Sequence, residues 1–232
     1  MSEPIEAARA DDRTVLTEAE SKRLLAEFGV STPAFDVVES ADEAVAAADR
    51  IGYPVVAKVS SPSVTHKSEW ADGAGVAVGL ESADAVRDAA EAISIAARKE
   101  GIDADVLIEA EADLDGGTEL IVGGMDDPSF GPVTLVGLGG VFTEVFEDTA
   151  HRLAPVSERE ARAAVESLQA APLLSGYRDR PAGDLDAVVE VVQATGDVLV
   201  ARPEIAEVDL NPVLVTPDGA TALDALVVLE DG

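Results

Sequence analysis

The chain of 232 residues contains no cysteine, which excludes disulfides and thiolate chemistry. Aromatic residues make up only 3% of a chain that is 47% hydrophobic, so the core must be built mainly from Ala, Val, Leu and Ile. The sequence shows no signal-peptide segment and no apolar run near the length that spans a bilayer. Neither a Walker A loop nor a GxGxxG fingerprint is present. We therefore expect a soluble, cytoplasmic protein.

Basic residues are also scarce, with 16 Lys and Arg against 46 Asp and Glu and a net charge of −30 at pH 7. This acid excess is spread along the chain, which argues against nucleic acid or an anionic membrane as a partner. The mean hydropathy of +0.15 opposes disorder. We interpret the acidity as an adaptation to high salt, where screening shortens electrostatic repulsion. The expected source is a haloarchaeon.

Capping patterns and apolar periodicity predict a mixed chain of helices and strands. Helices are expected over residues 17–29, 40–52, 82–100 and 184–201 and from residue 157, and strands over residues 34–38, 55–59, 73–78, 104–109, 118–122, 133–138, 206–215 and 222–229. A turn at 126–132 indicates an antiparallel pair, and 172–183 is expected to be irregular. Without a strict βαβ alternation, α+β lobes are favoured over a doubly wound sheet. The expected division is a flexible tail over 1–16, a first lobe over 17–109 and a second lobe with a metal site over 110–232.

The segment Gly52–Gly79, GYPVVAKVSSPSVTHKSEWADGAGVAVG, gathers much of the chain's scarce positive charge. It holds Lys58 and Lys67, two of four lysines, and His66, one of two histidines. A cationic loop in so acidic a chain favours an anion, and phosphate is the obvious one. Lys58 lies in an apolar strand, where it is either an edge-strand lysine with its ammonium in water or the partner of a group such as a phosphate oxygen.

The stretch EVDLNPVLV places Glu207, Asp209 and Asn211 on one face of a strand by alternation. Asp224, on the following hairpin strand, could lie opposite. Oxygen ligands from two adjacent strands, without His or Cys, suit Mg²⁺ that completes its coordination with nucleotide phosphates and water.

Other polar residues carry weaker signals. Arg152 is a candidate phosphate ligand, whereas the neighbouring His151 is interpreted as structural. The glycine cluster at 137–140 either lets the backbone approach a ligand or forms a simple turn. Acids embedded in predicted strands are interpreted individually as surface carboxylates: Glu109, Glu119 and Glu144.

Several segments together resemble the ATP-grasp β subunits of ADP-forming acetyl-CoA synthetases, relatives of the succinyl-CoA synthetase β chain. They are GYPVVAKVSSPSVTHKSE, VLIEAEADLDGGTELIVGGMDDPSFGP, GLGGVFTEVFED, HRLAP, and EVDLNP followed by ALDA. The resemblance runs from about Leu16 to Leu229. It implies an ATP-grasp fold, in which two α+β lobes with antiparallel sheets clamp the nucleotide.

The resemblance also implies roles for individual residues. Lys58 looks like the lysine that reaches the nucleotide phosphates, and Glu109 like the hinge acid near adenine and ribose. Glu119 resembles the acid on the next strand. The hinge departs from the Glu-Glu-hydrophobic pattern of relatives, because it reads Glu109-Ala110-Glu111, so either Glu109 or Glu111 could face the nucleotide.

Asn211 and Asp224 look like the Mg²⁺ pair, with Asp209 beside them, and His66 looks like the phosphoryl-carrying histidine. The implied reaction is acyl-CoA + ADP + phosphate ⇌ carboxylic acid + CoA + ATP, with ATP or ADP and Mg²⁺ bound. Because the chain contains nothing that looks like a CoA-binding Rossmann domain, a separate CoA-binding α subunit is expected, in an α2β2 assembly.

Two other functions stay open. An ATP-grasp carboxylate–amine ligase would use an acyl phosphate directly, and His66 speaks against it. A non-catalytic nucleotide-binding module is disfavoured by the retention of Lys58 and the Asn211/Asp224 pair.

Overall fold

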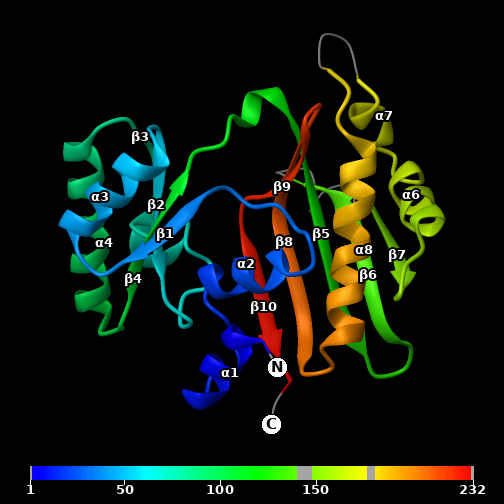
Figure 1. Cartoon of the computed structure of the whole chain (residues 1–232), viewed down its shortest axis with the longest axis horizontal. Coiled ribbons are helices and arrows are strands. Elements are labelled where there is room, and N and C mark those ends of the chain that lie inside the picture. The colour runs from blue at the N-terminus through cyan, green and yellow to red at the C-terminus, as the bar shows by residue number, and fades with distance from the viewer. Residues whose placement is uncertain (1, 140–147, 177–180, 231–232) are drawn as a thin grey trace. The chain divides into compact units, whose positions relative to one another are not determined.

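The computed structural model describes residues 2–139, 148–176 and 181–230, and the chain divides into two compact units (Figure 1). One unit is Pro33–Ala112, and the other combines Met1–Thr32 with Asp113–Gly232. Both sheets are antiparallel throughout, which confirms the predicted α+β class. No helix in the described ranges is long and apolar enough to cross a membrane.

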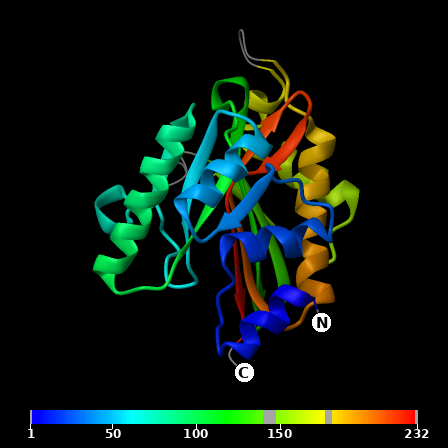
Figure 2. The ribbon, with the colours of Figure 1, turned by 60° about the vertical axis from the view of Figure 1, so that its left-hand side comes forward.

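The Pro33–Ala112 unit is a four-stranded sheet of order β1-β4-β2-β3, against which α3 and α4 lie side by side (Figures 1 and 2). Its elements are β1 (Phe35–Val38), α3 (Ala41–Ile51), β2 (Val55–Ser60), a 3₁₀ turn (Trp70–Gly73), β3 (Val76–Leu80), α4 (Ala83–Glu100) and β4 (Asp105–Ala110). Ser40 and Ser82 accept hydrogen bonds from the backbone at the starts of α3 and α4, as their sequence patterns predict.

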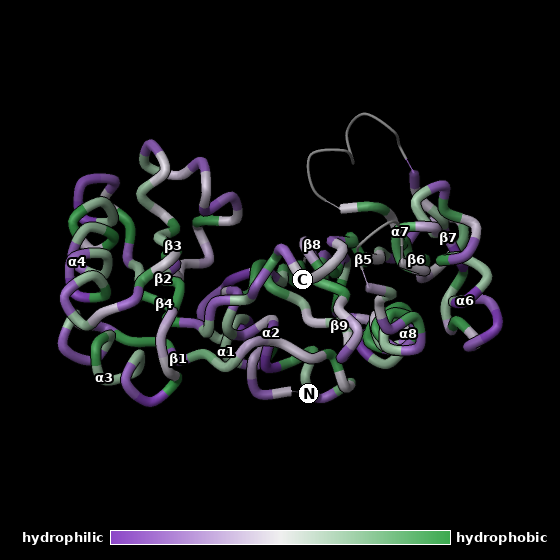
Figure 3. The backbone as a smooth tube through the Cα atoms, turned by 90° about the horizontal axis from the view of Figure 1, so that it is seen from above, coloured by the Kyte–Doolittle hydropathy of each residue, from purple (hydrophilic) through white to green (hydrophobic). Residues whose placement is uncertain are grey.

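The other unit is built on a sheet of order β10-β8-β5-β6-β7, with β9 paired to the far half of β8. Its elements are α1 (Glu3–Ala10), α2 (Glu18–Ala26), a 3₁₀ turn (Leu114–Gly116), β5 (Thr118–Asp127), β6 (Gly131–Leu138), β7 (Thr149–Leu153), α6 (Glu158–Glu166), α7 (Ala171–Leu174), α8 (Leu185–Ala201), β8 (Ile205–Thr216), β9 (Gly219–Ala222) and β10 (Ala225–Leu229). Helix α8 is predominantly hydrophobic and packs along β5, β6 and β8 (Figure 3).

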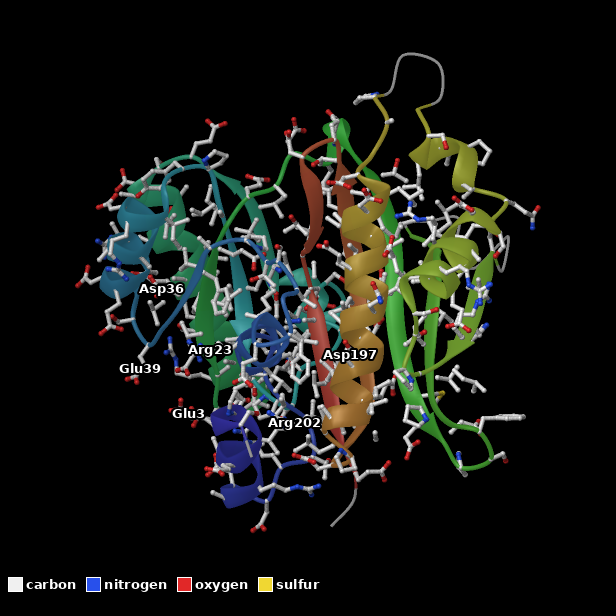
Figure 4. All side chains as sticks on the ribbon, turned by 45° about the vertical axis from the view of Figure 1, so that its right-hand side comes forward. Glu3, Arg23, Asp36, Glu39, Asp197 and Arg202 are labelled. Atoms are coloured by element: carbon white, nitrogen blue, oxygen red, sulfur yellow. The ribbon has the colours of Figure 1, made fainter. Side chains whose placement is uncertain are left out.

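Helix α2 begins at the predicted capping box, in which Thr17 and Glu20 each accept a hydrogen bond from the other's backbone. It buries Leu24 and Leu25 in the core of the larger unit. At the end of α8, the Arg202 guanidinium lies 5.7 Å from the centre of the Phe28 ring, just beyond α2 (Figure 4). The contact therefore links the C-terminal ends of α2 and α8.

The prediction of a flexible tail over residues 1–16 is wrong. Residues 3–10 form helix α1, whose Ile5 and Ala8 are fully buried. Leu16 donates its N–H to the Val227 carbonyl, so this segment runs beside β10. The sequence gives little sign of this helix, because α1 buries only three side chains, Pro4, Ile5 and Ala8. One of its contacts, from Arg9 to the Glu230 carbonyl, also joins residues 221 apart in the sequence.

The predicted lobe boundaries also differ from the structure. Residues 17–32 belong with 113–232, because the apolar face of α2 enters the core formed by the C-terminal sheet. The predicted strand 222–229 breaks at Leu223 and Asp224, opposite Pro212, which has no N–H to continue the ladder.

Smaller boundary errors have local causes. Strand β3 starts at Val76 rather than at residue 73, because Ala71, Asp72 and Gly73 all have positive φ and form a left-handed turn. The turn predicted at 126–132 is shorter, because β5 continues to Asp127 and β6 begins at Gly131. The short helix α7 overlaps the start of the stretch 172–183 that was predicted to be irregular. Gly140 and Glu144 lie outside the described residues.

We predict that Ile5→Ala lowers the free energy of unfolding by about 2–5 kcal/mol, because it removes a fully buried side chain from the core. The matched control is Ile95→Ala on α4, where the isoleucine is 44% exposed and the expected loss is below about 0.5 kcal/mol. Denaturant unfolding of both variants measures the difference. Equal losses would mean that α1 is not part of the folded core.

Candidate active site

Lys58 lies on β2, a central strand, so the edge-strand interpretation is wrong. Its neighbours Ala57 and Val59 face the core under α3 and α4, which places Lys58 on the opposite face of the sheet. The Nζ atom is 3.0 Å from Oε1 of Glu109 on β4, and the two side chains are 11% and 4% exposed. A buried ammonium requires such a partner, because leaving it without one would cost several kcal/mol.

The two acids that the resemblance assigned to a hinge have different surroundings. Glu109 lies on the sheet and is paired with Lys58. Glu111 follows the end of β4, and both of its carboxylate oxygens accept the Gly79 N–H at 3.1 Å. The structure thus joins Glu109 to the lysine predicted to bind phosphate, and joins Glu111 to the end of β3.

His66 lies on an exposed turn between β2 and β3, with its carbonyl accepting hydrogen bonds from the Glu69 and Trp70 amides. Residues on either side anchor the turn: Val64 and Lys67 are buried. A side chain at Gly75 would overlap the Lys67 carbonyl, so the close approach of these two segments requires glycine. The loop therefore holds the backbone of His66 in place while its imidazole is accessible to solvent.

In the other unit, β8 shows the predicted alternation, with Val208 and Leu210 buried and Glu207 and Asn211 exposed. Leu210 pairs with Ala225, so the next positions, Asn211 and Asp224, lie opposite each other across the two strands. Oδ1 of Asp224 accepts the Ala225 N–H at 2.8 Å, which orients the carboxylate. The structure thus brings Asn211 and Asp224 together as predicted.

These residues fit a magnesium site completed by a nucleotide. Within the described ranges, no three His, Cys, Asp or Glu side chains gather into a group that could hold a metal by themselves. Mg²⁺ is commonly held by one or two protein oxygens together with phosphates and water, and an Asn–Asp pair supplies that number. Asp209 lies on the same face of β8, two residues from Asn211.

Glu119 and Arg152 lie elsewhere on this sheet. The Glu119 carbonyl accepts the Gly139 N–H at 2.8 Å, and a side chain at Gly139 would clash with it. Arg152 lies on the edge strand β7, separated from β8 by β5 and β6, and its Nη1 donates to the His151 carbonyl at 2.8 Å. The sheet therefore keeps Arg152 apart from the Asn211/Asp224 pair.

Several buried polar residues escaped the sequence interpretation, among them Asp148 and Lys22. Asp148 accepts hydrogen bonds from the Gln169 and Ala170 amides, both at 2.8 Å. Lys22 on α2 is fully buried beside Glu18. The i, i+4 spacing of Glu18 and Lys22, next to the apolar pair at 24 and 25, was the available signal, but the same spacing is common on exposed helix faces.

We predict that Lys58→Met and Glu109→Leu each destabilise the protein by about 3 kcal/mol or more, because each leaves a buried charge without its partner. The double variant should be more stable than the sum of the two losses implies. The exposed Arg50–Asp36 pair, 2.8 Å apart in the same unit, is the control and should contribute under about 1 kcal/mol. A denaturant double-mutant cycle measures both pairs, and strictly additive losses for Lys58 and Glu109 would contradict the coupling.

Residues 7–229 match the ATP-grasp domain family. The chain is 37% identical over 230 residues to the β subunit of ADP-forming acetate–CoA ligase I of Pyrococcus furiosus, a match that covers 98% of this chain and 97% of that protein.

Two solved structures of acetyl-coenzyme A synthetase 1 of Candidatus Korarchaeum cryptofilum are similar to this chain. The complex with coenzyme A, Ca-AMPCP and HgCl⁺ has a TM-score of 0.91 and 36% identity, covering 97% of this chain and 98% of that one. The complex with coenzyme A and Mg-AMPPCP, with its phosphohistidine segment pointing towards the nucleotide binding site, has a TM-score of 0.85 and 36% identity, covering 98% of each chain. On fold and sequence together, the chain belongs to the ATP-grasp family and matches the β subunit of the ADP-forming acetate–CoA ligases over nearly its whole length.

Proposed function

We propose that this protein is the nucleotide-binding β subunit of an ADP-forming acyl-CoA synthetase, with acetyl-CoA as the representative substrate. The reaction is acyl-CoA + ADP + phosphate ⇌ carboxylic acid + CoA + ATP. The observation that carries this proposal is the match to a dedicated β subunit along 97% of that protein's length. The exposed imidazole of His66, on a turn anchored at both sides, supports a phosphohistidine step.

In the direction of ATP synthesis, a terminal oxygen of ADP attacks the phosphorus of phosphorylated His66. The new P–O bond forms as the N–P bond breaks, and the imidazole leaves as a neutral ring after taking up a proton. A neutral imidazole is also a competent nucleophile near pH 7 for the reverse step. The exposure of His66 lets it accept the phosphoryl group from a donor outside this chain.

Lys58 binds the nucleotide phosphates in this proposal, and Glu109 holds its ammonium in place. An ammonium has three N–H donors, so Lys58 can keep its contact with Glu109 while it donates to a phosphate oxygen. Glu111 and Glu119 are assigned to the nucleotide with Glu109, and Arg152 to a phosphate group.

Asn211 and Asp224, with Asp209 beside them, would hold Mg²⁺. The ion would neutralise charge on the phosphates during transfer. The orientation of Asp224 by the Ala225 amide supports this assignment, because a fixed carboxylate suits the strict geometry of Mg²⁺.

A CoA-binding α subunit would complete the enzyme, in an α2β2 assembly. The relative from P. furiosus is named as a β subunit, which supports a partner subunit. In this proposal the partner carries the CoA and acyl sites. The acid excess supports a salt-rich cytoplasm, such as that of a haloarchaeon, as the working environment.

We predict that His66→Ala abolishes acid-labile labelling by [γ-³²P]ATP and reduces acyl-CoA turnover to background, because it removes the phosphoryl-accepting nitrogen. Binding of Mg-ADP should survive, since Lys58 and the Asn211/Asp224 pair remain. The matched control is His151→Ala, which removes the other histidine, exposed on β7, and should leave both readouts unchanged. Undiminished turnover in His66→Ala would favour the direct acyl-phosphate mechanism of the carboxylate–amine ligases.

We also predict that the thermal midpoint of unfolding rises between low salt and molar KCl. At about 1 M salt the screening length falls to about 3 Å, which relieves repulsion among the 46 carboxylates. Calorimetric scans across a KCl series measure the shift. A midpoint that stays flat or falls would contradict the halophilic assignment.

A further inference from the structure

We propose that Lys22 positions the metal ligand Asp224, by holding the peptide group that precedes it through the Leu223 carbonyl. This inference rests on the proposed function, because it assumes that Asn211 and Asp224 bind Mg²⁺. Lys22 is 201 residues from Leu223 in the sequence, and its Nζ lies 2.9 Å from the Leu223 carbonyl oxygen.

The pair formed by Lys22 and Glu18 is unusual because both charges are buried. Their side chains are 0% and 1% exposed, and Nζ lies 2.7 Å from Oε1 of Glu18. Removing two ions from water costs several kcal/mol each, and apolar replacements of such pairs are often neutral or stabilising. Fold stability alone is therefore a weak reason for a lysine at this place.

Lys22 binds the backbone of the connector between β9 and β10, which consists of Leu223 and Asp224. The Leu223 N–H donates to the Pro212 carbonyl and the preceding Ala222 N–H donates to the Ser31 carbonyl, both at 2.9 Å. Lys22 binds the Leu223 carbonyl. Because that carbonyl and the Asp224 N–H belong to one planar peptide, fixing it also fixes the direction in which the chain enters Asp224.

The position of Asp224 matters because Mg²⁺ demands near-ideal octahedral geometry at about 2.0–2.1 Å. The Ala225 amide fixes its carboxylate from the C-terminal side. Lys22 fixes its backbone from the N-terminal side. Loss of groups that orient a metal ligand typically lowers metal affinity about 10–100-fold.

The chain offers a matched control on the same helix. Glu20 on α2 accepts both ends of the Arg13 guanidinium at 2.8 and 2.9 Å, with side chains 17% and 19% exposed. Burial raises the pKa of Glu20, but the hydrogen bonds from Arg13 and Thr17 outweigh it and lower the pKa overall. The contacts of this pair are with Asp11, Val15 and Thr17, so it holds the segment before α2.

The test compares Glu18→Gln/Lys22→Met with Arg13→Met/Glu20→Gln in the complete enzyme with its partner subunit. Each double variant removes both charges of one ion pair. Calorimetry measures the affinity for ADP with Mg²⁺ and with EDTA. We expect the Lys22 variant to lose about 10-fold or more of its Mg²⁺-dependent affinity, with ADP binding in EDTA unchanged. Its turnover should recover at correspondingly higher Mg²⁺, and the control should show neither effect.

Asp224→Ala separates failure of this inference from failure of the proposed metal site. If Asp224→Ala lowers Mg²⁺-dependent affinity but the Lys22 variant behaves like the control, only the positioning role is overturned. If Asp224→Ala has no effect, the metal assignment fails, and the inference with it. Glu18→Gln/Lys22→Gln, whose shorter side chain cannot reach Leu223, is a second variant with the same expected loss should the methionine variant not fold.

Discussion

The structure depends on where a highly acidic chain places its few lysines. Three of the four, Lys22, Lys58 and Lys67, are buried, although lysine is among the residues least often found inside proteins. Lys22 pairs with the buried Glu18 one turn earlier on α2, and Lys58 pairs with the buried Glu109 on the neighbouring strand β4. Exposed lysines would be the simplest way to offset the negative charge of the surface carboxylates. The burial of three lysines therefore indicates that their ammonium groups make specific internal contacts.

Strand register determines which of the candidate site residues lie next to each other. The pairing of β2 with β4 brings Lys58 to Glu109, and the pairing of β8 with β10 brings Asn211 to Asp224. Each set lies within one unit and is built by backbone hydrogen bonds, so it does not depend on a ligand to form. Lys58 and Glu109 belong to the Pro33–Ala112 unit, and Asn211 and Asp224 belong to the other unit.

The sequence predicted the parts that local chemistry determines. The capping boxes at Thr17 and Ser157 are present, and alternation along β8 correctly placed Asn211. The opposition of Asn211 and Asp224 could be predicted because a short hairpin sets the register. What sequence reasoning missed depends on distant partners: Arg9 on α1 donates to the Glu230 carbonyl, and Lys22 reaches the Leu223 carbonyl. Neither contact has a local pattern, because the matching group lies some 200 residues away.

Competitive labelling of lysines with an amine-reactive reagent, read by mass spectrometry, tests most directly whether the buried lysines serve the nucleotide site. Lys99 near the end of α4 is exposed and should react at the rate of a free amine. Lys22 and Lys58 should be protected, and Mg-ADP should protect Lys58 further while leaving Lys99 unchanged. Labelling of Lys58 at the rate of Lys99, with no response to Mg-ADP, would contradict the account.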